Sequence, residues 1–159
     1  RIRAVEVRGS DYLGAPMGDN GHVPRVIPRA LQGKGVTVIG SPDQPHTFTD
    51  VLDMGRALAL VATEESAWGR VWHAPSNAPR TQAQAVNDVL ASVGAKPVKV
   101  KGMPKALLSM VGPFVPLVRE LQETAYMFTG PYIMESSAIG TAYGLEPTPW
   151  DEVCRRTVG

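Results

Sequence analysis

Few residues in this sequence could carry out acid–base or nucleophilic chemistry, and they are widely separated. The chain has three histidines, His22, His46 and His73, and one cysteine, Cys154. The histidines show none of the spacings typical of metal ligands, such as HxxxH, so we expect each to be structural or at the surface. Cys154 falls in an expected helix without an evident general base nearby, which favours a structural thiol over a nucleophile. The sequence therefore predicts no metal site.

Tyrosine followed by lysine four positions later is a second pattern with clear chemistry. On a helix, this spacing lets the lysine lower the pKa of the phenol while it holds a ribose. The residues four positions after the four tyrosines are Pro16, Gly130, Ser136 and Pro147. No such pair exists in the sequence, so we assign no catalytic residue.

A dinucleotide site needs a glycine-rich turn that leads from a strand into a helix, where backbone N–H groups meet the pyrophosphate. The best glycine pair is Gly33 and Gly35. It follows an expected helix and precedes an expected strand, which is the reverse order. We interpret it as a helix terminator and a turn.

Length, composition and net charge limit the classes of protein to which this chain can belong. With 159 residues, 43% of them hydrophobic and 19% charged, the chain fits one compact domain or a large part of one. Its net charge of +1 gives no basic field for nucleic acid. The apolar run over 103–117 contains Lys105 and three prolines, so it is too broken for a membrane span. A single cysteine suits a reducing cytoplasm. The start at Arg1, without methionine, leads us to expect a fragment, a truncation or a partial sequence.

Hydrophobic periodicity predicts an α/β chain. We expect strands over 2–8, 36–39, 70–73 and 97–100, a short extended piece over 47–51, and a loop over 9–21. A helix is expected over 23–31, where Pro28 either delays its start or kinks it. Further helices are expected from an N-cap at Asp53 to 62, from a cap at Thr81 over 82–93, and over 104–111, 115–128, 137–143 and 150–156. These strands are too few for a complete doubly wound sheet.

Four segments together carry a resemblance to a known family. Residues 7–15 form a strand that ends in arginine and continues as Gly-Ser-Asp-Tyr-Leu-Gly-Ala. Residues 45–54 read Pro-His-Thr-Phe-Thr-Asp-Val-Leu-Asp-Met, 69–76 form a strand and loop before the helix that opens at Thr81, and 146–149 read Glu-Pro-Thr-Pro before a last helix. In order and spacing, the set resembles the C-terminal, substrate-binding part of the extended short-chain dehydrogenase/reductases, the NAD-dependent epimerase/dehydratase family.

The resemblance implies the C-terminal part of an extended Rossmann-type fold, with a few parallel-sheet strands and a mostly helical substrate lobe. It implies one partial domain over 1–159, in which 1–75 mix sheet-completing and cleft segments and 76–159 form the helical lobe. The N-terminal Rossmann half, with the catalytic tyrosine and lysine, would be absent from this chain. NAD or NADP would be bound mainly by that half.

The same resemblance assigns candidate site residues. Gly9 and Ser10 follow a sheet strand where the family approaches the nicotinamide, and Asp11 is expected either to bind substrate hydroxyls or to cap a turn. Tyr12 and His46 are also assigned to the substrate. The order Tyr-Leu reverses the family's usual aromatic order, and Ala15 replaces its usual proline. His46 stands where sugar-nucleotide enzymes tend to carry an arginine for the diphosphate, and an imidazole is a poorer partner for phosphate.

We therefore expect the parent protein to be an NAD(P)-dependent epimerase, dehydratase or reductase. Its substrate would be a small carbonyl or alcohol and not a nucleotide sugar. The apolar run over 103–117 would either line a pocket for a less polar substrate or form the core of the helical lobe. The chain alone would be inactive, and homo-oligomers are an open expectation. The alternative is a non-enzymatic binding or interaction module derived from the same fold.

Overall fold

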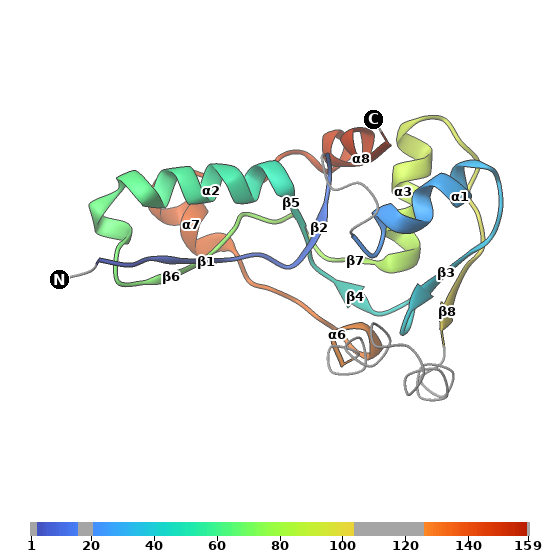
Figure 1. The fold of residues 1–159 in the computed structure, drawn as a ribbon, viewed down its shortest axis with the longest axis horizontal. Coiled ribbons are helices and arrows are strands. Elements are labelled where there is room, and N and C mark those ends of the chain that lie inside the picture. Colours follow the sequence, from blue (N-terminus) through green and yellow to red (C-terminus); the bar gives the residue numbers. More distant parts are fainter. Residues whose placement is uncertain (1–2, 16–20, 104–125, 159) are drawn as a thin grey trace.

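The computed structural model of the chain describes residues 3–15, 21–103 and 126–158. Short strands alternate with helices along these segments (Figure 1). The strands are β1 (Glu6–Arg8), β2 (Asp11–Leu13), β3 (Val36–Ile39), β4 (Pro45–His46), β5 (Phe48–Asp50), β6 (Val71–His73), β7 (Arg80–Thr81) and β8 (Val100–Met103). The helices are η2 (Pro24–Val26), α1 (Ile27–Leu31), α2 (Val51–Thr63), η3 (Glu65–Ala67), α3 (Gln82–Ser92), α6 (Tyr126–Thr129), α7 (Ser137–Tyr143) and α8 (Trp150–Val158).

The strands of the described segments pair two by two. β1 pairs with β6, β2 with β5 and β3 with β8, all in parallel, whereas β4 and β7 pair antiparallel. Figure 1 shows β1, β6, α2 and α7 at one end of an elongated molecule, and α1, α3, β3 and β8 at the other. β2, β4 and β5 lie between the two ends. Parallel pairs joined through helices are the hallmark of α/β proteins.

One hydrophobic cluster fills the end that contains α2. Its members come from α2, η3, β6 and α7, and they are Ala57, Val61, Ala67, Trp72, Ala74 and Ile139. The indole N–H of Trp72 donates to the carbonyl of Ala67 at 3.0 Å, so the only polar atom of this buried ring is satisfied. Ala57 and Val61 lie one turn apart on α2, which is the spacing that places both on the same face.

A second cluster fills the other end and joins segments from both halves of the sequence. Its members are Leu13, Val23, Ile27, Ala30, Val36, Phe48, Ala85, Val86, Val89, Leu90, Val153 and Cys154. The last helix, α8, packs on α3, and the Trp150 indole donates to Asp88 at 2.8 Å. Residues on each side of position 75 thus share one core. The division of the domain at residue 75 remains a prediction.

The helix capped by Thr81 is confirmed in detail. The Thr81 hydroxyl accepts from the backbone N–H of Gln84 at 3.1 Å, and the Gln84 side chain accepts from the Thr81 N–H at 2.8 Å. This reciprocal pair is a capping box. Gly94 then takes a positive φ of 72° just past the end of the helix, a conformation that side chains with a Cβ disfavour.

The expected N-cap at Asp53 is wrong. The helix begins at Val51 with Asp50 as its N-cap, and Asp53 lies in the first turn with its side chain buried. The Asp53 carboxylate instead accepts from the Thr148 N–H at 2.6 Å, from the Thr148 hydroxyl at 2.7 Å and from Arg56 at 2.7 Å. Two of these three donors come from Thr148, which is distant in sequence, so the local pattern could not distinguish a cap from a tertiary anchor.

Other elements also differ from expectation, and the strand expected over 2–8 begins only at Glu6. The expected loop over 9–21 contains the strand β2, and the strand expected over 97–100 begins only at Val100. The helix expected over 23–31 opens as a 3-10 turn, and its α-helical part begins at Ile27. Pro28 lies in the first turn of this α-helix, where a backbone N–H would have no acceptor within the helix, so proline is tolerated there. The expected helix over 104–111 and most of the one over 115–128 lie outside the described residues.

Candidate substrate-binding site

The carboxyl ends of β1 and β6 lie side by side, because the two strands are parallel and Arg8 pairs with His73. In open α/β sheets, this is the edge at which ligands bind. Residues 9–11 follow β1, and residues 74–77 follow β6. Both segments carry polar side chains, so the edge has the chemistry of a candidate site.

Ser10 joins the two segments to β5. Its hydroxyl donates to the carbonyl of Thr47 at 2.7 Å, and its backbone N–H donates to the Thr49 hydroxyl at 2.9 Å. The Thr49 hydroxyl in turn lies 2.9 Å from the Ser76 hydroxyl. The donors of Ser10 are thus engaged inside the fold, where they position the start of β2.

Gly9 and Tyr12 contact each other. A Cβ built on Gly9 would lie 3.1 Å from the Tyr12 ring, so the glycine allows the ring to fold back against the backbone after β1. Asp11 and Tyr12 are consecutive in β2, so their side chains leave opposite faces of the strand. Tyr12 therefore does not lie on the face that carries Asp11.

The side chains of Asp11 and His46 lie in contact. Nε2 of His46 lies 2.8 Å from Oδ2 of Asp11, although the two atoms lack the alignment of a hydrogen bond. The His46 side chain is 3% exposed and that of Asp11 is 20% exposed. The carboxylate is thus the part of this pair that reaches solvent and could accept a hydrogen bond from a ligand hydroxyl.

Aromatic rings enclose the His46 imidazole. It stacks on Phe128 at 5.5 Å and 11°, and on Tyr132 at 5.2 Å and 29°. Tyr132 is fixed by its backbone, since its N–H donates to the carbonyl of Pro45 and its carbonyl accepts from the N–H of Thr47, both at 2.9 Å. Sequence reasoning missed both rings, because nothing in the pattern links 45–48 with 128–132.

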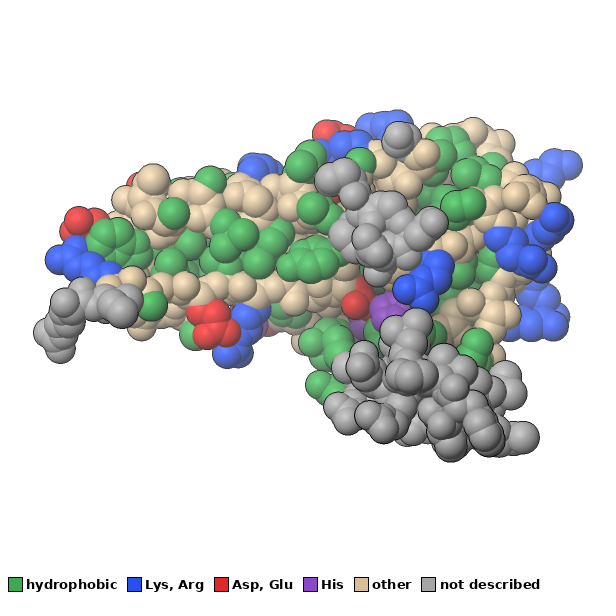
Figure 2. Space-filling view, viewed as in Figure 1, with side chains coloured by type: hydrophobic (Ala, Val, Ile, Leu, Met, Phe, Trp, Pro, Cys, Tyr) green, Lys and Arg blue, Asp and Glu red, His purple; other side chains and the backbone are tan. Residues whose placement is uncertain are grey.

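His22 completes the surroundings of this pair. Its ring meets Phe128 edge-on at 4.1 Å. Burial lowers the pKa of His22 below its ordinary value, Asp11 raises it in part, and Arg25 and His46 lower it further. Figure 2 shows histidine, acidic and basic side chains gathered beside one another near the middle of the molecule.

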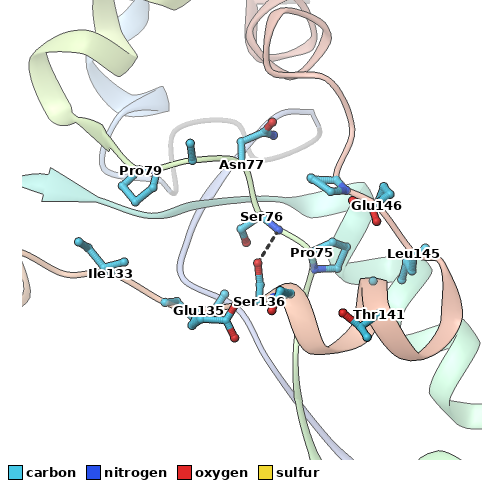
Figure 3. A pocket seen from close by; sticks show the side chains of 15 residues that line it. Pro75, Ser76, Asn77, Pro79, Ile133, Glu135, Ser136, Thr141, Leu145 and Glu146 are labelled. Carbon is cyan, nitrogen blue, oxygen red and sulfur yellow. Dashed lines mark hydrogen bonds between the residues drawn. The ribbon is translucent and has the colours of Figure 1, made fainter.

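A pocket of about 530 Å³ opens next to the segment that follows β6. Residues 75–79 line one side, and residues 133–137, α7 and residues 145–147 line the rest (Figure 3). The backbone N–H of Ser76 donates to the Ser136 hydroxyl at 3.2 Å across its inner end. Ser76 therefore borders the pocket and also touches Thr49, which binds Ser10.

Gly14 is not available for the pyrophosphate of a dinucleotide. Gly14 is the glycine that follows β2, but its N–H already donates to the Thr157 hydroxyl at 3.0 Å. The Asp50 carboxylate, which is paired with Arg156, occupies the space where a Cβ of Gly14 would stand, so a phosphate has no room there. Gly9 and Ser10 were assigned to the cofactor. Both donors of Ser10 are bonded to Thr47 and Thr49, whereas Gly9 lies just after the carboxyl end of β1, and its assignment stays a prediction.

Other chemistry is limited in the described segments. Residues 3–15, 21–103 and 126–158 contain no group of three or more His, Cys, Asp or Glu side chains that could hold a metal ion. They also contain no helix with the length and apolar character needed to cross a bilayer. Cys154 is buried, and burial raises its pKa to about 12, so the thiolate needed for nucleophilic attack is disfavoured.

Solved structures share this fold, although neither a family model nor a curated protein matches the sequence. UDP-glucose 4-epimerase of Thermotoga maritima, solved with UDP-glucose, matches 99% of this chain at 20% identity and a TM-score of 0.68. The dTDP-glucose 4,6-dehydratase of Bacillus anthracis, solved with NAD, matches 96% at 14% identity and a TM-score of 0.65. RMD of Pseudomonas aeruginosa, solved with NADPH, matches 96% at 16% identity and a TM-score of 0.61.

The match covers only part of those proteins. The chain spans 45%, 42% and 45% of the three structures, respectively. Identities this low establish the fold and leave the activity open. The expected fold class is confirmed: this chain has the fold of part of a Rossmann-type short-chain dehydrogenase/reductase, the architecture of NAD-dependent epimerases and dehydratases.

Proposed function

We propose that this chain is the substrate-binding part of an NAD(P)-dependent epimerase, dehydratase or reductase that acts on a small carbonyl or alcohol. The observation that carries the proposal is the Asp11–His46 pair, which stands beyond the carboxyl edge of β1 in this fold. Asp11 would accept a hydrogen bond from a substrate hydroxyl, and His46 would hold the carboxylate in place. Gly9 would border the nicotinamide.

The substrate in this proposal carries no nucleotide diphosphate. The nearest nitrogen of His46 faces the Asp11 carboxylate at 2.8 Å, and the imidazole is closed in by Phe128 and Tyr132. A diphosphate needs donors with positive charge, whereas a partly exposed carboxylate repels it. The solved structures that bind nucleotide sugars are similar in fold, which does not fix the substrate of this chain.

Turnover in this proposal needs residues beyond the 159. NAD or NADP would supply the hydride acceptor or donor, and a part of the protein outside these 159 residues would bind most of it. The sequence also has no Tyr-x-x-x-Lys pair to move the proton at the substrate oxygen. The chain would therefore bind substrate without converting it.

Ligand-detected NMR on the 159-residue chain tests the substrate assignment. Cyclic hydroxyketones and alcohols should bind saturably, and Asp11→Asn should weaken them about tenfold, because a hydrogen bond to a charged acceptor is lost. Asp43→Asn, at an exposed turn, is the control and should leave binding unchanged. UDP-glucose binding more tightly than every neutral compound would overturn the substrate class, and unchanged binding in Asp11→Asn would overturn the site.

The same preparation tests the claim about turnover. Absorbance at 340 nm should stay constant when the chain is mixed with NADH or NADPH and the carbonyl compounds that bind. Oxidation of either cofactor that depends on the chain would show that the 159 residues hold a complete active site.

A further inference from the structure

One end of the molecule, which contains α1, β3 and β8, carries exposed basic side chains without acidic neighbours in sequence. Residues 21–42 and 89–103 contain no aspartate or glutamate. Figure 2 shows Lys and Arg side chains along this end, at the right of the view, with no acidic side chain among them on the face drawn. We call this surface the basic end, and its exposed members are Arg29, Lys34, Lys96, Lys99 and Lys101.

The backbone at Gly35 brings several of these residues together. The Arg29 guanidinium donates to the Gly35 carbonyl at 3.1 Å, and Lys34 is the residue before it. A Cβ built on Gly35 would lie 3.2 Å from the carbonyl oxygen of Lys99, so the two segments touch there. Lys99 and Lys101 both line a hollow of about 300 Å³ between β3 and β8. Side chains from separate segments of the chain therefore share one surface.

Basic side chains elsewhere in the described segments have partners that offset their charge. Arg70 lies over the Trp72 ring at 4.5 Å. Six other arginines lie within 4.0 Å of a carboxylate, and they are Arg3, Arg8, Arg56, Arg80, Arg155 and Arg156. None of the five members of the basic end forms an ion pair among the residues that the structure describes. Their charge is therefore available to an anionic partner.

Two aliphatic side chains are exposed beside these charges. Leu31 is the last residue of α1 and is 39% exposed, and Val93 directly follows α3 and is 45% exposed. Each lies three positions before a lysine of the basic end, Lys34 and Lys96. Both helices lie at this end of the molecule (Figure 1). A partner that covers the basic end can thus remove hydrocarbon from water as well as neutralise charge.

The combination of charge and hydrocarbon favours a lipid surface over nucleic acid. Residues 21–42 and 89–103 contain no Phe, Tyr or Trp on which bases could stack. Four of the five members are lysines, which act as point charges and need no matched geometry in their partner. A bilayer offers many anionic headgroups above a hydrocarbon layer. We propose that the basic end docks on a membrane surface rich in anionic lipid, with Leu31 and Val93 inserted between the headgroups.

Sedimentation with lipid vesicles tests this docking on the 159-residue chain. Vesicles in which about a third of the lipid is phosphatidylserine should carry the chain into the pellet, because each basic side chain near the surface adds to the attraction. Vesicles of phosphatidylcholine alone should leave the chain in solution. Binding should weaken steeply as salt is added, since the interacting charges are exposed and therefore screened.

Charge variants locate the contact. Lys99→Gln and Lys101→Gln combined in one chain should weaken binding to the phosphatidylserine vesicles about 25-fold, since each basic side chain contributes about fivefold. Arg3→Gln combined with Arg155→Gln is the matched control, because it removes the same charge from ion-paired positions elsewhere. The control should bind as the parent chain does, and circular dichroism should show that both double variants are folded.

Serine variants separate a lipid surface from other anions. Leu31→Ser combined with Val93→Ser should weaken vesicle binding about tenfold, because less hydrocarbon is transferred out of water. The same variant should bind polyglutamate as the parent chain does, since that polymer has negative charge and no hydrocarbon layer. Leu58→Ser, at a similarly exposed position of α2, is the control and should keep the parent's affinity for vesicles.

Three outcomes would overturn docking on lipid. Equal sedimentation with both kinds of vesicle would show that the lipid charge has no role. Equal losses in the two charge variants would show a response to net charge alone. Binding to polyglutamate as tight as to the phosphatidylserine vesicles would assign the basic end to an acidic polypeptide. These measurements do not involve Asp11, so the proposed substrate site is tested separately.

Discussion

His22 is the histidine whose titration the fold alters most clearly. Burial keeps its pKa below the ordinary value of 6.5, so the folded chain holds this imidazole neutral where the unfolded chain has begun to protonate it. The unfolded state then binds more protons, and this contribution to stability falls as the pH drops below 6.5. Asp50 acts in the opposite direction at lower pH, because burial raises its pKa.

We expect His22→Phe to reduce the loss of stability on acidification. The phenyl ring can keep the edge-on contact with Phe128 but cannot take up a proton. Urea unfolding of both proteins at pH 7.5 and pH 5.5 measures the change, with His73→Phe as the control at a partly exposed ring. An equal loss in His22→Phe and the parent chain would show that His22 is not the group responsible.

Sequence reasoning at the level of single residues succeeded where the cause is local or general. A lone cysteine in an amphipathic helix was expected to be structural, and Cys154 is buried with a raised pKa. The family resemblance assigns Asp11 and His46 each to the substrate, and this assignment stays a prediction. The stacking of Phe128 and Tyr132 on His46 could not be predicted, because it depends on packing between segments more than 80 residues apart.

Among the elements, α3 depends on a cap that the sequence displays. Thr81→Ala removes the acceptor for the Gln84 N–H and should lower the free energy of unfolding by about 1 kcal/mol. Thr81→Ser keeps the oxygen and should recover most of that loss. Chemical denaturation monitored by circular dichroism measures both, and equal stability of the alanine and serine variants would contradict a role for the cap.

Elements with strong local signals were predictable, whereas those fixed by tertiary pairing were not. α3 has helical periodicity, a capping box and a terminal glycine, and its predicted start is correct. β2 is only three residues long and exists because it pairs with β5, about 37 residues later. Asp53 is of a residue type that often caps helices, yet its carboxylate accepts hydrogen bonds from Thr148, which lies between α7 and α8.

At the scale of the whole molecule, the two hydrophobic clusters should unfold together. The chain passes between them four times, from β1 to β2, from β5 into α2, from β6 to α3 and from α7 to α8. Leu90→Ala, at a fully buried position, should cost about 2–5 kcal/mol and should lower hydrogen-exchange protection in α2 as well as in α3.

Val61→Ala in the other cluster is the matched variant and should give the converse result. If Leu90→Ala lowered hydrogen-exchange protection in α3 and left it unchanged in α2, the two clusters would be separate unfolding units. That result would also bear on the predicted division at residue 75, since α2 lies before this position and α3 after it.

The contact between Asp50 and Arg156 has a consequence for the order in which segments can fold during synthesis. The Asp50 side chain is fully buried beside Gly14, and Arg156 of α8 approaches it at 2.5 Å. A nascent chain presents residue 50 long before residue 156 leaves the ribosome. Until then, this carboxylate has no counter-charge from α8, and the junction of β5 with α2 should stay open. Assembly of the fold around β5 should therefore wait until α8 has been synthesised.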